Sequence, residues 1–284
     1  MKVIFISDFG IHQNSGGAQV SNDIIIKQGE SRGHSIKLHN YDSSPIDFLE
    51  SYDVLISSNL EQIYKISPEK LKFILDHKKH FRLEHDSCFY FGNDDRQKVF
   101  GSTVINFFLS EFHVNYFRES YGDIFHNVSI IHDPIDTDLF YSDDSPKQYD
   151  IVYCGYLHQL KGLENLVKFS IQNRDRQIDV FGWGDFDCES FFKNYSNINF
   201  HHRLAHKEVA NVFRSAKSIF HSPIVNEPFC RMVGEALLCG VEEVLGNPEK
   251  IGSFLEYKRL GADTFKSECS KASITFWDKI ESSL

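Results

Sequence analysis

The segment 220–240 constrains the fold of this chain more than any other. A short apolar run at 218–221 predicts a strand, and a Ser-Pro loop and a helix follow it. The helix is predicted to begin near Phe229, with Asn226 as its cap and Pro228 in its first turn, where a missing N–H is no loss. One buried helical stripe is expected from the residues Phe229, Met232, Val233, Ala236 and Leu237. The glycine that closes the segment is placed to end the helix.

Two glutamates of this segment, Glu227 and Glu235, lie off the stripe. In a helix, at about 1.5 Å per residue, their spacing separates them by roughly 12 Å. This length suits a nucleotide-sugar, with the sugar at one end, the ribose at the other and the diphosphate over the helix start. The spacing alone is also met by a helix that carries two solvated glutamates.

The residues around the two glutamates carry a resemblance to a known family. With Pro-Phe-Cys after the first and Ala-Leu-Leu-Cys-Gly after the second, the segment resembles the donor-site motif of the family-4 retaining glycosyltransferases of GT-B fold. The resemblance implies an α/β protein with two Rossmann-like, doubly wound parallel-sheet domains facing across a cleft. It implies an acceptor-side domain at 1–146, a nucleotide-sugar domain at 147–268 and a C-terminal helix at 269–284 that crosses back to the first domain. A length of 284 residues agrees with two domains.

Alternating strands and helices run along the whole chain, which is typical of parallel sheets. The strands are expected at 3–7, 35–39, 53–57, 80–84, 103–107, 128–131, 149–154, 177–181, 198–200, 218–221 and 242–245. Besides the helix of the first paragraph, the helices are expected at 19–32, 68–77, 111–121 (capped by Ser110) and 206–214.

Two places in the first half are candidate site elements. Gly16 and Gly17 follow the first strand, and such glycines let backbone N–H groups approach a phosphate, although a plain turn is the alternative. They resemble the GGAE-type loop of the same family, with Gln19 in place of the glutamate. His85 lies at the carboxyl edge of a strand, where open α/β sheets bind ligands. The family has a histidine near the transferred sugar at this point; a surface or core histidine is the alternative.

In the second half, the run from Gly155 to Gly162 matches the family pattern G-R-L-x-x-x-K-G in spacing. The resemblance implies that Lys161 holds the donor diphosphate. Tyr156 stands where the family has arginine, so one cation of the leaving-group clamp is lost. His202-Arg203-Leu204 stands where the family has the turn that reads the nucleotide base.

The resemblance implies a metal-independent, retaining sugar transfer. Glu235 would hold the ribose hydroxyls, and Glu227 would hold the sugar hydroxyls or shield an oxocarbenium-like transition state, a covalent role being left open. The catalytic candidates are Glu227, His85 and Lys161, and the donor-binding candidates are Gly16, Gly17, Tyr156, Arg203, Leu204, Phe229, Cys230, Arg231 and Glu235.

Arg231 lies off the apolar stripe, four residues before Glu235 and therefore on nearly the same helix face. Its guanidinium could replace the charge lost at Tyr156, or it could pair with Glu235 or another carboxylate. No acidic pair is placed to demand a metal ion, and no cofactor is expected beyond a nucleotide-sugar donor, UDP- or GDP-linked. The acceptor is left open among a glycan, a lipid and a small molecule, as is the oligomeric state.

Charge and cysteine usage narrow the class of protein. A formal charge of −10, from 30 basic and 40 acidic residues, argues against a nucleic-acid partner. The six cysteines form no C-x-x-C pair, which favours reduced thiols in a cytoplasmic protein over disulfides or zinc. The apolar run at 1–7 is too short for a signal peptide, and no run approaches the ~20 apolar residues that span a bilayer. Peripheral contact with a membrane is left open.

Two other functions stay open. One is a degenerate nucleotide-sugar-binding protein without catalysis, which Tyr156 and His202 suggest. The other is a phage-type enzyme that glucosylates DNA on the same fold, against which the acidic composition speaks.

Overall fold

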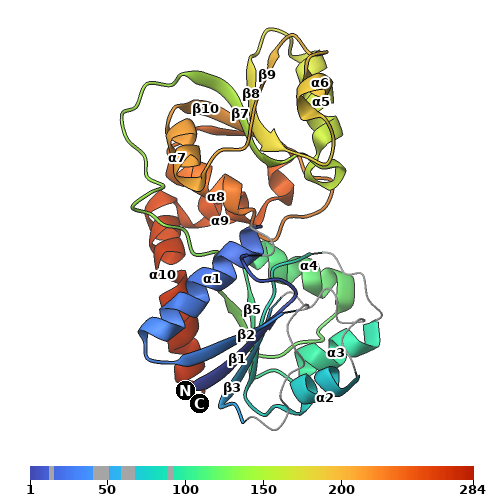
Figure 1. Cartoon of the computed structure of the whole chain (residues 1–284), viewed down its shortest axis with the longest axis vertical. Helices are drawn as coiled ribbons and strands as arrows, with labels where there is room; N and C mark the ends of the chain where they lie inside the picture. The colour runs from blue at the N-terminus through green and yellow to red at the C-terminus, as the bar shows by residue number, and fades with distance from the viewer. Residues whose placement is uncertain (13–15, 41–50, 59–67, 88–92) are drawn as a thin grey trace. The chain divides into compact units, whose positions relative to one another are not determined.

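The computed structural model describes residues 1–12, 16–40, 51–58, 68–87 and 93–284, with residues 93–96 described by their backbone alone (Figure 1). The chain divides into two compact units. The first unit contains Met1–Pro134 and Glu268–Leu284, and the second contains Ile135–Ser267. The domain limits expected at 146 and 268 stay a prediction.

In the described part of the first unit, a sheet of parallel strands has the order β2-β1-β3-β4-β5-β6. Its strands are β1 Lys2–Ser7, β2 Ser35–His39, β3 Val54–Ser58, β4 His80–Leu83, β5 Ile105–Phe108 and β6 Val128–Ile130. The helices between them are α1 Gly17–Ser31, α2 Pro68–Asp76, α3 Asn93–Gly101 and α4 Glu111–Tyr121. The central strand β3 is buried along its whole length, which is why Val54, Leu55 and Ile56 follow one another without polar residues between them.

The second unit has its own parallel sheet, of order β11-β10-β7-β8-β9. The strands are β7 Tyr149–Tyr156, β8 Ile178–Trp183, β9 Ile198–His201, β10 Ala216–His221 and β11 Glu243–Gly246. The helices and 3₁₀ turns are η2 Gln159–Lys161, α5 Leu163–Gln172, α6 Cys188–Phe192, α7 His206–Arg214, α8 Arg231–Leu238, η3 Pro248–Lys250, α9 Gly252–Leu260 and α10 Ala262–Glu281. The expected fold class, two Rossmann-like parallel sheets, is confirmed.

The C-terminal part of α10 completes the core of the first unit, and Figure 1 shows α10 (red) beside α1 (blue). The indole N–H of Trp277 donates to the carbonyl of Ile25 at 2.8 Å. The ring of Phe276 lies 4.6 Å from that of Phe107. Gly29 of α1 is required here, because a Cβ at this position would lie 2.3 Å from the Trp277 ring. The last helix is therefore part of the first unit's core.

Three buried histidines of the first unit are held neutral. Burial lowers the pKa of His80 to about 3 and the pKa values of His39 and His113 to about 4. The ring of His80 is hydrogen-bonded to the hydroxyls of Ser57 at 2.7 Å and Ser102 at 3.0 Å. Each of these histidines has to become exposed to water before its ring takes up a proton.

The first unit is therefore expected to lose stability in acid. Because the folded pKa of His80 lies below its ordinary value of 6.5, the unfolded chain binds the proton first. The stability that neutral His80 contributes to the folded unit is complete above pH 6.5 and is lost as the pH falls toward 3. We expect His80→Gln to reduce the slope of the unfolding free energy between pH 6.5 and 4 by about 1.4 kcal/mol per pH unit. Denaturant unfolding at several pH values measures this slope.

The matched control is His126→Gln, at an exposed histidine of the same unit. It should leave the slope as in the wild type. An equal change in both variants would show that His80 is not the source of the acid sensitivity.

No helix in the described ranges is long and apolar enough to cross a membrane. The described cysteines, Cys154, Cys188, Cys230, Cys239 and Cys269, are free thiols, as the sequence predicted. Cys88 lies outside the described residues.

Candidate functional site

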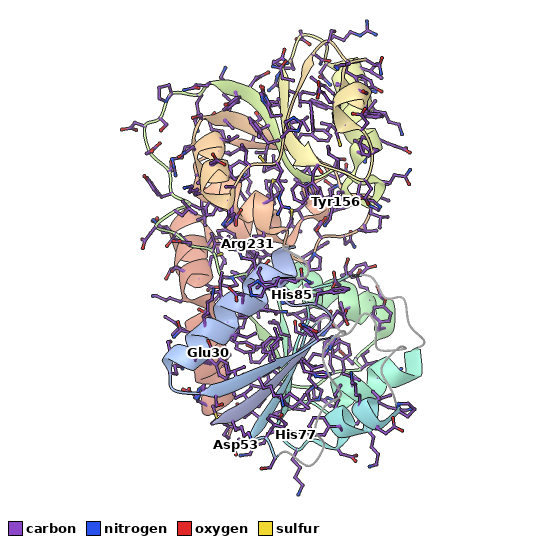
Figure 2. The ribbon with its side chains drawn as sticks, viewed as in Figure 1. Glu30, Asp53, His77, His85, Tyr156 and Arg231 are labelled. Carbon is purple, nitrogen blue, oxygen red and sulfur yellow. The ribbon has the colours of Figure 1, made fainter. Side chains whose placement is uncertain are left out.

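The candidate site of the second unit is built at the carboxyl edge of its sheet. In a parallel sheet all strands end at the same edge, so the residues that follow them lie near one another. Tyr156 ends β7, Trp183 ends β8 and His221 ends β10. Arg231 begins the helix that follows β10, and Figure 2 labels Arg231 and Tyr156.

The helix α8 begins later than the sequence predicted. Its first residue is Arg231, so Asn226 is not its cap and Pro228 is not in its first turn. The residue at the cap position is Cys230, with φ +67°, a left-handed conformation that is uncommon outside glycine. Glu227 therefore lies in the loop before the helix, and the helical separation of about 12 Å between the two glutamates does not apply.

A distant segment of the chain explains the later start. The backbone N–H of Glu227 donates to the carbonyl of Lys250 at 2.8 Å, and its own carbonyl accepts from the N–H of Gly252 at 2.9 Å. The carbonyl of Phe229 accepts from the N–H of Ser253 at 2.7 Å. This parallel pairing ties the loop at Glu227 to the segment around Ile251, so the local capping residues do not start a helix.

Both glutamates are buried, and the alternative of two solvated glutamates is wrong. Glu227 is 7% exposed and Glu235 is 4% exposed. The apolar stripe is confirmed on α8 at Val233, Ala236 and Leu237, all buried, whereas Met232 is half-buried. Phe229 is also buried, but it precedes the helix. The ring of Phe229 stacks on Phe265 inside the unit, so the donor contact predicted for Phe229 would have to come from its main chain.

The turn η2 presents Lys161. The side chain of His158 caps this turn by accepting from the N–H of Leu160 at 3.2 Å. The turn ends at Gly162, with φ +86°, and a Cβ there would lie 1.9 Å from the carbonyl oxygen of Ser222. This close approach seats the turn on the loop that follows β10.

Lys161 and Glu227 form an ion pair with Nζ 2.7 Å from Oε1. The lysine side chain is 43% exposed, so it can contact a ligand while it neutralises the buried carboxylate. His221 Nε2 lies 3.5 Å from the same oxygen. Burial alone would raise the pKa of Glu227, but Lys161 and His221 outweigh it and hold the pKa at about 2. Burial alone would lower the pKa of His221, but Cys230 and Glu227 outweigh it and raise the pKa to about 10.

Glu235 is the acceptor of a second cluster. Its Oε1 lies 2.8 Å from Nε of Arg231 and 2.9 Å from Nε2 of His206. The side chain of Arg231 is only 9% exposed. Of the two interpretations given for Arg231, the pairing with Glu235 is confirmed, and its contact with a diphosphate stays a prediction.

Aromatic residues gather at the ends of β7 and β8. The hydroxyl of Tyr156 donates to Asp185, and the Tyr156 ring stacks on His158 at 5.7 Å. The guanidinium of Arg203 lies 4.2 Å from the ring of Trp183. Leu204 is half-buried, and His202 is exposed. Tyr156 supplies a hydroxyl and a ring where the family pattern has a cation.

The candidates of the first unit lie at its own sheet edge. His85 follows β4 and is buried, with Nε2 3.1 Å from Oδ1 of Asn22 and Nδ1 3.8 Å from Oδ1 of Asp133. Gly16 caps α1, and Gly17 is its first residue. The roles of these three residues stay predictions.

Sequence reasoning missed His221, His206 and Trp183. His221 and Trp183 could have been found, because His221 ends a predicted strand and Trp183 follows one by two residues, at the carboxyl edge of their own sheet. His206 begins a predicted helix, and nothing in its local sequence indicates that it reaches Glu235.

Solved structures resemble this chain over its whole length. Sucrose-phosphate synthase from Thermosynechococcus elongatus is 13% identical, with a TM-score of 0.68, and the match covers 99% of this chain and 96% of that chain. HepE of Anabaena in complex with UDP-glucose is 13% identical, with a TM-score of 0.64 and coverage of 99% and 98%. A glycosyltransferase from Rickettsia africae is 14% identical, with a TM-score of 0.60 and coverage of 98% and 94%.

No family model matches the sequence, and no curated protein matches it. The structural matches agree with the two parallel sheets described above. The chain therefore has the GT-B fold of these glycosyltransferases.

Proposed function

We propose that this protein is a retaining glycosyltransferase that moves a sugar from a nucleotide-sugar donor to a glycan, lipid or small-molecule acceptor. The observation that carries the proposal is the pair of Lys161 and Glu227 at the carboxyl edge of the second sheet. A buried carboxylate held ionised beside a half-exposed ammonium supplies both charges that the reaction needs. The lysine faces the negative charge that grows on the leaving diphosphate, and the carboxylate faces the positive charge that grows on the sugar.

The start of α8 supports a diphosphate site. Helix N-termini favour anions, yet this one begins with a cation, Arg231, whose charge opposes the helix dipole. An anionic ligand at this place would be favoured both by the helix dipole and by the guanidinium of Arg231. In this proposal Glu235 holds the ribose, and Arg203 with Leu204 faces the base. His85, Gly16 and Gly17 take part as the family resemblance implies.

UDP-glucose is the first donor to try, because HepE of Anabaena was solved in complex with it. The proposal needs no cofactor beyond the donor and no metal for the transfer step.

A thermal-shift screen with UDP, GDP, ADP and their sugars, followed by an assay for sugar transfer and donor hydrolysis, tests the proposal. We expect one nucleoside diphosphate to raise the melting temperature and its sugar to be turned over. NMR of the first product should show the anomeric configuration of the donor. Product of inverted configuration would contradict retention.

Tyr156 favours a second candidate, a binding protein without catalysis. Its hydroxyl is engaged by Asp185, and it brings no positive charge to the leaving group. This candidate predicts tight nucleotide-sugar binding with neither transfer nor hydrolysis, so the same two assays separate it from the enzyme.

Arg231 gives a prediction about the missing cation. We expect Arg231→Ala to weaken binding of the nucleoside diphosphate by about 1.5–3 kcal/mol, the usual contribution of a hydrogen bond to a charged group, and to affect the nucleoside far less. Tyr156→Arg in the same chain should restore part of the loss. Calorimetric titration with both ligands measures the difference.

Binding of the nucleoside is the internal control, because it also reports any damage from the lost pair with Glu235. Equal small losses for both ligands, without rescue by Tyr156→Arg, would assign Arg231 to pairing alone.

A further inference from the structure

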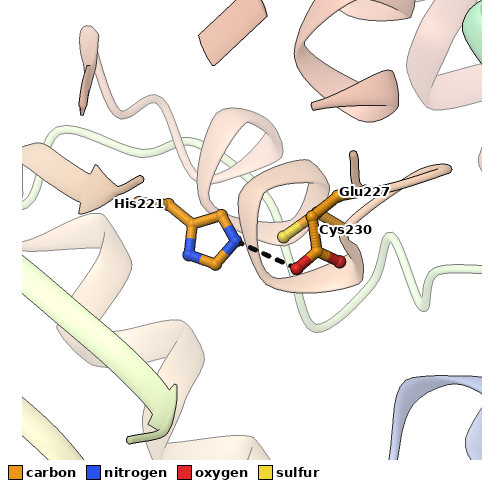
Figure 3. A group of neighbouring side chains, drawn as sticks. All are labelled: His221, Glu227 and Cys230. Atoms are coloured by element: carbon orange, nitrogen blue, oxygen red, sulfur yellow. Dashed lines mark ion pairs between the residues drawn. The ribbon is translucent and has the colours of Figure 1, made fainter. Parts of the chain in front are cut away.

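We propose that His221, Glu227 and Cys230 form a binding site for a divalent transition-metal ion of the zinc class (Figure 3). One ligand atom from each side chain, an imidazole nitrogen, a carboxylate oxygen and a thiol sulfur, lies within 4.8 Å of the other two. This set of donors suits zinc, which binds histidine, carboxylate and thiolate ligands. No metal was expected from the sequence, because no acidic pair is placed to demand one and the cysteines form no C-x-x-C pair.

The distances need little adjustment. Zinc lies about 2.0–2.3 Å from such ligands, so tetrahedral ligand atoms are roughly 3.5 Å apart. Nε2 of His221 and Oε1 of Glu227 are already 3.5 Å apart, and the ligand atoms of all three residues lie within 4.8 Å of one another. Figure 3 shows the three side chains converging on one point beside the loop that precedes α8.

The backbone holds the three residues in place. His221 is paired with Gly246 at the end of β10. Glu227 is fixed by its parallel bridge to Ile251. The carbonyl of Cys230 accepts the hydroxyl of Ser253 at 3.1 Å. The backbone of such a site is already ordered before an ion binds, and only the side chains have to adjust.

Two features of the cluster favour a bound ion. His221 is 4% exposed, its ring nitrogens make no hydrogen bond of normal geometry to the described residues, and Nε2 has a long ion pair of 3.5 Å with Oε1 of Glu227. Cys230 has φ +67°, which is costly for a residue with a side chain. A bound ion would take the place of a proton on one nitrogen of His221 and of the thiol proton of Cys230, and both protons would go to solvent.

Lys161 and the ion would compete for Glu227. The ammonium is 2.7 Å from Oε1, so it now supplies the positive charge beside this carboxylate. A metal ion on Glu227 would be repelled by Lys161 until the lysine turns away into solvent, which its half-exposed side chain permits. Three protein ligands leave a fourth position for water.

The test is titration of the full-length, EDTA-treated and reduced protein with Co²⁺, which replaces zinc and reports thiolate ligation by a charge-transfer absorption. We expect one equivalent to produce this absorption and Zn²⁺ to abolish it. Cys230→Ser should remove the absorption, and His221→Gln should weaken Co²⁺ binding by about tenfold or more. The matched control is Cys188→Ser, at a buried cysteine of α6 in the same unit, which should behave as the wild type.

Lys161→Ala should change the affinity for Co²⁺ in the opposite direction. It removes the competing cation, so Co²⁺ should bind more tightly than in the wild type. No absorption in the wild type, or the same absorption in Cys230→Ser, would overturn the proposal. Unchanged or weaker binding in Lys161→Ala would overturn Glu227 as a ligand. All these readouts measure binding, so they stand independently of sugar transfer.

Discussion

Replacing Lys161 by alanine is expected to lower the rate of sugar transfer by about 10²- to 10³-fold, the usual effect of removing one group that stabilises charge in the transition state. The substitution removes the cation that faces the leaving diphosphate. It also removes the closest charge on Glu227, so the pKa of Glu227 should rise. The acid limb of the activity profile should therefore move to higher pH.

The measurement is kcat for donor turnover across a pH series, in Lys161→Ala and in the control Lys168→Ala. Lys168 is an exposed lysine of α5 that pairs with Glu164 on the surface, and its loss should change nothing. If Lys161→Ala kept the kcat of the wild type, Lys161 would have no part in the transfer step.

Replacing Glu235 by alanine is expected to damage both the fold and the nucleotide site. The carboxylate accepts from Arg231 and His206, and Arg231 is nearly buried. Breaking a buried ion pair on one side costs about 3–5 kcal/mol of stability, because it leaves a charge without its partner. The lost contact to the ribose should cost about 1.5–3 kcal/mol of nucleotide affinity. Denaturant unfolding and calorimetry measure the two losses separately.

A double variant, Glu235→Leu with Arg231→Met, separates the two roles. It removes both charges, so much of the stability should return, as in other proteins whose buried pairs were replaced by apolar residues. Affinity for the nucleoside, which does not depend on a contact between Arg231 and the diphosphate, should stay low. Stability and affinity that recover together would mean that Glu235 acts only in packing.

The strands of both sheets could be predicted from the sequence because their signal is local. The expected strand at 35–39 coincides with β2, and the expected helix at 206–214 coincides with α7. Hydrophobic periodicity and the residues that end helices and strands can both be recognised in a short stretch of sequence. Ser110 caps α4 by accepting from the N–H of His113, as predicted. Gly240, with φ +76°, lies just past the C-cap of α8 and ends it as expected.

The start of α8 was predicted wrongly because a distant segment decides it. Asn226 and Pro228 favour a helix locally, but the pairing of Glu227 with Ile251 ties this loop to a distant segment, and the helix begins only at Arg231. Burial of Glu227 follows from the same pairing, whereas Glu235 is buried by contacts of α8 with Arg231 and His206. Short-range patterns contain no information on which segment pairs with the loop.

The side-chain clusters of the candidate site could not be predicted from the sequence alone. The family resemblance indicated Lys161, Glu227 and Glu235, and the spacing of four residues to Glu235 indicated Arg231. It could not show that Arg231 and His206 share one oxygen of Glu235, or that His221 and Cys230 meet at Glu227. These contacts join residues from separate strands, loops and helices.

The central claim is that a nucleoside diphosphate binds at η2 and at the start of α8. Hydrogen exchange of the full-length protein, with and without the nucleotide that stabilises it most, tests this claim directly. Our account predicts slower exchange in the peptides that cover 156–165 and 226–238. Saturating nucleotide that leaves the exchange of both peptides unchanged would contradict it.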